Sequence, residues 1–303
     1  MNFPASIELT EVGPRDGLQN QQSIIETNIK VAFLDALSKT GIRRIEVSSF
    51  VNPKWVPQLA DASDVFSKIH RAKNVKYLAL VPNEQGWERA CSVGVDEIAL
   101  ITAASETFCK KNTNSTIAGS IERMQPIVEK AKSNGVSIRG YVSCITACPY
   151  EGEIDPKKVS AVVEKLLDIG VEEVSLGETI GVAVPTDIAR LYDSLDGILS
   201  PQDSALHLHD TRGTALACAS AAMQLGVYKF DTSAGGLGGC PYAPGAAGNL
   251  ATEDLVYFAN RMGIRTGIDL DSILSSIQMI EEFIDTPLQS RVYRASSCQD
   301  PSS

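Results

Sequence analysis

A repeated alternation of strand and helix patterns runs along the 303-residue chain and limits its possible folds more than any other feature. Each expected strand is a short apolar run, and a stretch with helical periodicity follows it. The expected strands are residues 7–12, 44–49, 75–81, 95–101, 136–143, 173–176, 205–209 and 229–233. The expected helices are residues 26–39, 56–70, 84–92, 115–134, 156–169, 185–199, 214–225 and 252–262. Eight such units are the number that closes a parallel barrel, so we predict an α/β fold of the (β/α)8 TIM barrel type.

Glycine positions agree with this alternation. Glycines between a helix pattern and the next strand pattern can adopt the left-handed conformation that ends a helix at low cost. These residues are Gly41, Gly94, Gly135, Gly170 and Gly226. An open doubly wound sheet is the main alternative, and such a sheet usually carries a GxGxxG turn after its first strand. The turn here reads GPRDG at residues 13–17, which favours the barrel.

The same pattern sets the expected domain organisation. We expect a single barrel domain over residues 1–303, with its core at about 5–265 and a C-terminal helical extension at 266–303. Within the extension, residues 269–285 predict an extra amphipathic helix, and the final SSCQDPSS segment is expected to fray.

Composition excludes several classes of partner. The net charge is −10 and no block of Lys and Arg is present, so we expect no nucleic-acid partner. No run approaches the roughly 20 apolar residues that span a bilayer, so we expect no membrane partner. The seven cysteines are scattered, and no signal peptide is visible, which favours a reduced, cytoplasmic setting. We expect Cys91 and Cys218, on helix patterns, to serve in packing.

Polar residues at the C-terminal ends of the expected strands are the first candidates for function, because barrel enzymes carry their sites there. Arg15 and Asp16 follow the first strand, and Glu46 lies within the second. His207 and His209 end the seventh strand, and a glycine-rich segment at residues 235–249 follows the eighth. Four separate segments thus bring reactive groups to one rim.

The His-Leu-His sequence is the sharpest local signal. Residues two apart on a strand face the same way, so His207 and His209 would form a two-ligand platform for a divalent metal. A pair of packed histidines is the alternative, and an HxH sequence alone would favour it. The chain has only three histidines, however, and Asp16 can reach this rim as a third ligand. Asp16 could also serve only as a turn or cap residue.

Two further residues have a functional and a structural interpretation. Glu46 lies between Ile45 and Val47, and a buried carboxylate needs a partner, which we expect to be Arg15. The pair could be purely structural, or it could orient Arg15 towards a substrate. Cys240 lies in the glycine-rich segment, where a flexible loop can close over a ligand and expose a thiol. The segment from Gly235 to Gly239 could instead cradle a phosphate.

The chain resembles a known family through six motifs. They are VGPRDGLQN (12–20), IEVSSFVNPKWVPQ (45–58), RGYVSCITACPYEG (139–152), SLGETIGV (175–182), LHDTRG (208–213) and GLGGCPYAPGAAGNLATEDLVY (236–257). These motifs closely resemble the 3-hydroxy-3-methylglutaryl-CoA lyase family, within the metallolyase barrel superfamily. The resemblance runs from about residue 7 to residue 267. The first and last motifs are specific to the lyase branch, whereas HxH is shared with related synthases.

The resemblance implies a role for each matching residue. The implied ligands of a divalent cation, Mg or Mn, are Asp16, His207, His209 and Asn249. The implied catalytic residues are Arg15, Glu46, His207 and Cys240, with Arg15 stabilising an enolate and Cys240 acting as an acid or base. The implied substrate-binding residues are Arg15, Gln19, Ser49, Ser175 and Glu178. The chain departs from the family at Glu178, Arg212 and Gln22, where Asp, Tyr and Lys are usual.

The implied reaction is a retro-Claisen cleavage of 3-hydroxy-3-methylglutaryl-CoA to acetyl-CoA and acetoacetate, without a redox cofactor. Either His207 or Glu178, the latter through water, would remove the hydroxyl proton. The implied partner is an acyl-CoA substrate, and a homodimer or higher homo-oligomer is expected. Two alternatives stay open: a lyase or condensing enzyme for another 3-hydroxyacyl-CoA, and a metal-binding barrel without turnover.

Overall fold

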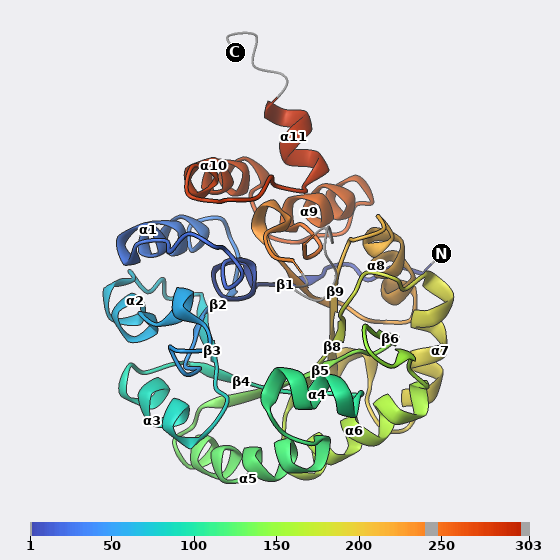
Figure 1. The fold of residues 1–303 in the computed structure, drawn as a ribbon. Coiled ribbons are helices and arrows are strands. Elements are labelled where there is room, and N and C mark those ends of the chain that lie inside the picture. The colour runs from blue at the N-terminus through green and yellow to red at the C-terminus, as the bar shows by residue number, and fades with distance from the viewer. Residues whose placement is uncertain (1, 240–247, 298–303) are drawn as a thin grey trace.

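The computed structural model describes residues 2–239 and 248–297, and a closed barrel of parallel strands lies at its centre (Figure 1). The strand order around the barrel is β1-β10-β9-β8-β5-β4-β3-β2. The strands are β1 (Glu8–Glu11), β2 (Arg44–Ser49), β3 (Lys76–Leu80), β4 (Glu97–Ala103), β5 (Ser137–Ser143), β8 (Glu173–Glu178), β9 (Ser204–Leu208) and β10 (Lys229–Thr232). The predicted (β/α)8 fold is confirmed, and the open doubly wound alternative is wrong.

Helices surround the barrel and bury their apolar faces against the strands (Figure 1). In α6 (Pro156–Asp168), for example, Val159, Val163 and Leu166 are buried, and Asp155 caps the helix by accepting from the Lys157 amide. The other helices of the ring are α1 (Thr27–Leu37), α2 (Ala62–Lys68), α3 (Glu84–Ser92), α5 (Ile117–Ser133), α7 (Pro185–Leu195), α8 (Ala215–Gln224) and α9 (Thr252–Arg261). Each lies within one of the expected helical stretches.

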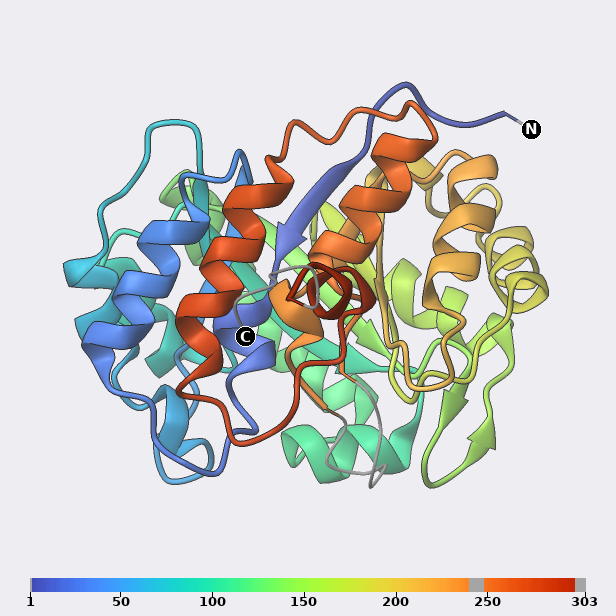
Figure 2. The same cartoon turned by 90° about the horizontal axis from the view of Figure 1, so that it is seen from above.

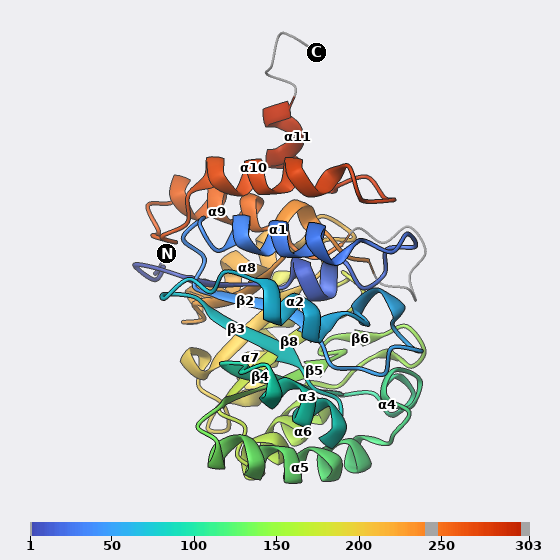
Figure 3. The same ribbon diagram turned by 90° about the vertical axis from the view of Figure 1, so that its left-hand side faces the viewer.

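Several short elements were not expected from the sequence. Helix α4 (Glu106–Thr113) follows β4, and a small hairpin of β6 (Ala147–Cys148) and β7 (Gly152–Glu153) follows β5. Figure 3 shows α4 and β6 at the same end of the molecule. Elements this short carry too few residues for a periodic pattern, which is why the sequence did not indicate them.

The C-terminal extension packs beside the first helix of the ring. Helix α10 (Leu270–Glu281) contacts α1 and α9, and the three helices run side by side in Figure 2. It lies within the predicted helix at 269–285. A second helix, α11 (Arg291–Ser297), contacts α9 and was not predicted. Ser296 and Ser297 of the segment expected to fray belong to α11, and residues 298–303 lie outside the described part of the chain. Among the described helices, none combines the length and apolarity needed to cross a membrane.

The barrel interior holds a column of charged side chains. Residues two apart on a strand face the same side, so Arg139 and Tyr141 of β5 point inward while Ile138 and Val142 pack against the helices. Arg139 bridges Glu173 of β8 at 2.9 Å and Asp231 of β10 at 2.6 Å. Each of these charges is paired, which is what makes their burial tolerable. At one end of the column, Asp231 Oδ2 lies 3.5 Å from Nδ1 of His207, near the C-terminal end of β9.

Candidate active site

A single π-helical turn, η1 (Gly13–Gly17), places two predicted site residues after β1. The Val12 carbonyl accepts from the amides of Arg15 at 3.1 Å and Asp16 at 2.7 Å. A Cβ atom at Gly13 would lie 2.6 Å from a carboxylate oxygen of Glu11, so this turn needs glycine there. Single π-helical turns are frequent at functional sites.

Three predicted metal ligands come together at the rim. His207 lies in β9 and His209 just beyond it, and their Nε2 atoms are 3.4 Å apart. The Asp16 Oδ2 atom lies 3.9 Å from His207 Nε2. One ligand atom from each of the three residues fits within 4.8 Å of the others. The expected convergence of these segments is therefore confirmed, because β1 and β9 both neighbour β10.

Asn249, the fourth predicted ligand, completes the cluster. Its backbone pairs with that of His209 in an isolated bridge, and its Nδ2 donates to Asp16 Oδ2 at 2.8 Å and to the Leu237 carbonyl at 2.9 Å. Its Oδ1 atom is buried and has no hydrogen-bond partner within residues 2–239 and 248–297. An unpartnered buried oxygen beside a carboxylate fits a cation ligand.

The electrostatics of the cluster suit a divalent cation. His209 Nδ1 donates to the Thr179 carbonyl at 2.5 Å, which leaves a lone pair on Nε2 for a metal. Burial raises the pKa of Asp16, but Arg15 and the two histidines outweigh this effect and lower it to about 2. Asp16 is therefore an anion at neutral pH. Imidazole and carboxylate together suit several divalent metals, so the residues present fit the implied ion.

The predicted Arg15–Glu46 ion pair is also present. Arg15 Nη2 lies 2.8 Å from Glu46 Oε2, and Nη1 lies 2.7 Å from Asp16 Oδ1. Glu46 is fully buried, and burial raises its pKa above the ordinary value even though Arg15 opposes the shift. In the described structure Arg15 is the one cation that bridges this carboxylate. The guanidinium is thereby held beside Asp16 at the candidate metal site.

The predicted substrate-binding residues differ in their access to the site. Gln19 is half-buried and donates to Asp16 Oδ1 at 2.9 Å. Ser49 is buried, and its hydroxyl donates to the Leu80 carbonyl at 3.3 Å. The Ser175 hydroxyl is fully buried and donates to Asp231 at 2.7 Å, so in this conformation it faces the charged column.

Two of the departures from the family pattern meet on one loop, residues 179–182. The buried Glu178 carboxylate accepts from the amides of Gly181 at 2.6 Å and Val182 at 3.1 Å. Arg212 donates to the carbonyls of Ile180 and Gly181 at 3.1 and 3.2 Å. This loop includes Thr179, whose carbonyl orients His209. Gln22, the third departure, is exposed.

The structure bears on two further predictions, the phosphate cradle in the glycine-rich segment and the packing roles of the helix cysteines. Cys240 lies outside the described residues. The phosphate cradle is wrong for Gly235, because its amide already donates to both oxygens of buried Glu253 at 3.1 Å. Cys218 is buried as expected, but Cys91 is exposed, so its assignment to packing is wrong. It lies on the solvent face of α3.

Sequence reasoning missed Asp231 and Arg139, which underlie the cluster. Asp231 Oδ2 lies 3.5 Å from His207 Nδ1, and Arg139 holds its other oxygen. The signal was available, since a charge inside a barrel strand needs a partner, as with Glu46.

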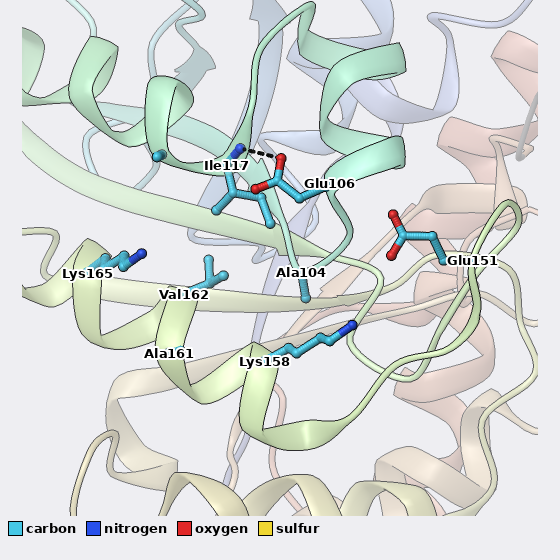
Figure 4. Close-up of a pocket in the computed structure, with 9 residues that line it drawn as sticks. Ala104, Glu106, Ile117, Glu151, Lys158, Ala161, Val162 and Lys165 are labelled. Atoms are coloured by element: carbon cyan, nitrogen blue, oxygen red, sulfur yellow. Dashed lines mark hydrogen bonds between the residues drawn. The ribbon is translucent and has the colours of Figure 1, made fainter.

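A separate cavity of about 270 Å³ lies between α5 and α6 (Figure 4). Glu106, Lys158 and Lys165 contribute to its lining, and Glu106 accepts from the Ile117 amide at 3.1 Å. The cavity shares no residue with the metal-ligand cluster, so it is not part of this site.

Imidazole, carboxylate and amide groups gather at the C-terminal ends of the strands of this parallel barrel. That arrangement is typical of the metal-dependent barrel enzymes. Comparison with known proteins narrows this class. The sequence model of the HMGL-like family matches residues 6–280. The chain therefore belongs to the HMGL-like family.

Relatives over nearly the whole chain agree with this assignment. The chain is 45% identical to 3-hydroxy-3-methylglutaryl-CoA lyase, cytoplasmic, of Rattus norvegicus, over 97% of this chain and 86% of the rat protein. It is similar to the crystal structure of hydroxymethylglutaryl-CoA lyase from Pseudomonas aeruginosa, with a TM-score of 0.95, 44% identity, and coverage of 98% and 99%. It is also similar to an HMG-CoA lyase from Acinetobacter baumannii in complex with coenzyme A and 3-methylmalate, with a TM-score of 0.93, 36% identity, and coverage of 99% and 98%. The predicted resemblance is confirmed.

Proposed function

We propose that the protein cleaves 3-hydroxy-3-methylglutaryl-CoA to acetyl-CoA and acetoacetate. The observation that carries this conclusion is the cluster of Asp16, His207 and His209 beside Arg15, in a chain 45% identical to a lyase of that name. The alternative of a barrel without turnover is disfavoured, because Arg15 and Glu46 add an oriented cation to the metal ligands. The same guanidinium also lies 2.7 Å from Asp16, a predicted metal ligand, which favours a role in the reaction over charge balance alone.

Asp16, His207, His209 and Asn249 would hold one divalent cation, Mg or Mn, in this proposal. When bound, the cation acidifies the tertiary hydroxyl of the substrate and fixes its orientation. Mixed oxygen and imidazole ligands suit these two metals. Retro-Claisen cleavage transfers no net electrons, so the proposed reaction needs no redox cofactor.

The chain's own residues handle the proton and the developing charge. His207, or Glu178 through a water molecule, takes the hydroxyl proton. The carbon–carbon bond then breaks, acetoacetate leaves, and the bonding electrons move into the enolate of acetyl-CoA. Arg15 stabilises the negative charge on the thioester oxygen, and Glu46 holds Arg15 in place. Cys240, or an acid behind it, returns a proton to the enolate carbon.

The identity of the substrate's acyl group is the most specific part of the proposal. The Acinetobacter baumannii relative with bound coenzyme A supports an acyl-CoA substrate. Glu178 and Arg212 hold the 179–182 loop beside His209, so their departure from the family pattern can change substrate preference without removing the cluster. A lyase or condensing enzyme for another 3-hydroxyacyl-CoA is the second candidate.

A product assay separates the two candidates. The protein is incubated with a panel of 3-hydroxyacyl-CoA compounds and Mg or Mn, and the products are identified by mass spectrometry. We expect the highest kcat/KM for 3-hydroxy-3-methylglutaryl-CoA, with acetyl-CoA and acetoacetate as products. Preferential cleavage of another member of the panel would contradict the proposed substrate and support the second candidate.

A further inference from the structure

The second ring nitrogen of His207 is buried beside a carboxylate that no sequence motif singled out. His207 Nδ1 has no hydrogen-bond partner by strict geometry in the described chain. Its nearest anionic neighbour is Asp231 Oδ2, at 3.5 Å. Catalytic hydrogen bonds are often long before substrate and cofactor bind, so this distance is compatible with a functional contact.

Asp231 is held in place independently of His207. Arg139 Nη2 contacts its Oδ1 at 2.6 Å, and the Ser175 hydroxyl donates to its Oδ2 at 2.7 Å. All three side chains are buried. Glu173 forms a salt bridge with Arg139 at 2.9 Å and a second one with Lys229 at 2.7 Å. The carboxylate therefore cannot turn away from the imidazole without breaking this column.

The charge of Asp231 decides which nitrogen of His207 carries the proton. The buried Arg139 guanidinium lies 2.6 Å from Asp231 Oδ1, and a buried ion pair of this kind keeps the carboxylate ionised. An ionised carboxylate only accepts, so the facing Nδ1 carries the hydrogen. The Nε2 lone pair then points to Asp16 and His209, where the cluster lies.

We propose that Asp231, fixed by Arg139 and Ser175, is a positioning residue that keeps His207 in the tautomer able to bind the cation through Nε2. The inference rests on the metal site of the proposed function and deepens it. It also distinguishes the two histidines, because a charged carboxylate orients His207 whereas the neutral Thr179 carbonyl orients His209. The carboxylate makes His207 the more strongly donating ligand.

One consequence concerns the proton that leaves the substrate hydroxyl. With its hydrogen on Nδ1 facing Asp231 and its Nε2 lone pair on the cation, His207 would have no lone pair left to accept a proton. The proposal therefore assigns this step to Glu178 through water. Glu178 ends β8, the strand next to β9, and its carboxylate accepts from the Gly181 and Val182 amides in the loop that orients His209.

The alternative is that Asp231 serves only to balance the charge of Arg139. The chain offers a matched control for this alternative, because Glu173 is a second carboxylate on the same guanidinium, and it bridges other cations rather than His207. Glu173→Gln should disturb the charged column without changing the tautomer of His207. Asp231→Asn keeps the shape of the side chain but places an amide donor opposite Nδ1, which favours hydrogen on Nε2.

The experiment reads the tautomer and the metal affinity without turnover. The chain has only three histidines, so ¹⁵N-histidine spectra of the metal-free protein at pH 8 are simple, and His70→Gln and His209→Gln assign the remaining signal. We expect Nδ1–H on His207 in the wild type and in Glu173→Gln, and Nε2–H in Asp231→Asn. We expect Mn²⁺ to bind Asp231→Asn about 10- to 100-fold more weakly, measured by electron paramagnetic resonance.

Two results would overturn the inference: an unchanged tautomer with a Mn²⁺ Kd within about twofold of the wild type, or an equal loss of affinity in Glu173→Gln. If Asp231→Asn does not fold, Ser175→Ala provides a second test, because it loosens the Asp231 carboxylate while keeping its charge. We expect this variant to bind Mn²⁺ several-fold more weakly, and an unchanged Kd would contradict the proposal. A tautomer switch in a protein that cleaves no acyl-CoA would leave this inference intact and reject the proposed function.

Discussion

Replacement of Arg15 with glutamine tests whether this guanidinium acts on the reaction or only balances a buried carboxylate. Arg15 lies 2.8 Å from Glu46 and 2.7 Å from Asp16. Charge develops on the thioester oxygen only as the carbon–carbon bond breaks, so an oriented donor there acts mainly in the transition state. We expect Arg15→Gln to lower kcat by roughly 100-fold or more with a much smaller change in KM.

The same substitution has a structural effect that follows from the burial of Glu46. This carboxylate is fully buried and would lose its one bridging cation in the described structure. Removing one member of a buried pair costs about 3–5 kcal/mol of unfolding free energy. The double variant Arg15→Gln/Glu46→Gln removes the uncompensated charge, so we expect it to regain most of that stability and none of the lost kcat.

Urea unfolding and steady-state assays on the wild type, the single variant and the double variant measure both effects. Unfolding free energies should fall and then recover across the series, whereas kcat should stay low in both variants. An unchanged kcat with a raised KM in Arg15→Gln would assign Arg15 to ground-state binding. Recovery of kcat in the double variant would show that the loss came from the unpaired carboxylate and would refute the transition-state role.

Three other predictions follow from the site and its surroundings. Asn249→Ala should weaken Mn²⁺ binding by roughly tenfold or more, because it removes a buried unpartnered oxygen. Titration calorimetry measures the Mn²⁺ Kd, and an unchanged Kd would exclude Asn249 as a ligand. Cys240→Ser should fold and bind metal normally but cleave slowly, and alkylation should inactivate the wild type and a Cys91→Ser control alike; full activity in Cys240→Ser would reject its catalytic role. Burial raises the pKa of Glu253 from 4.5 to about 8 in the folded chain, so between these values the folded chain holds a proton that the unfolded chain releases. The difference in unfolding free energy between the wild type and Glu253→Gln should therefore fall as pH rises from about 5 to 8, by up to about 1.4 kcal/mol per pH unit. Urea unfolding of both proteins across this pH range measures the difference, and the absence of such a fall would contradict the prediction.

The sequence predicted the barrel and most of the cluster because both depend on local patterns. A strand pattern followed by a helix pattern needs no knowledge of distant residues, and an HxH sequence places two imidazoles on one face by strand geometry alone. Glu46 lies in a barrel strand, where a buried charge requires a partner. That partner, Arg15, follows β1, which neighbours β2 in the closed barrel.

The parts that the sequence did not predict depend on contacts between distant strands. Asp231 pairs with Arg139, 92 positions away, and its effect on His207 passes through space rather than along the chain. Ser175 was expected to bind substrate, yet the structure turns its hydroxyl to Asp231. The register between β5, β8 and β10 around the closed barrel sets these contacts.

The most direct test of the account is a metal titration of stripped protein with 3-hydroxy-3-methylglutaryl-CoA as substrate. After chelation, Mn²⁺ is added back in steps while bound metal and released acetoacetate are measured in the same samples. The account predicts that activity rises with occupancy, reaches its plateau at one metal per chain, and stays absent in His207→Ala and His209→Ala. Full activity in the stripped protein, or metal bound at this site without any acetoacetate, would contradict it.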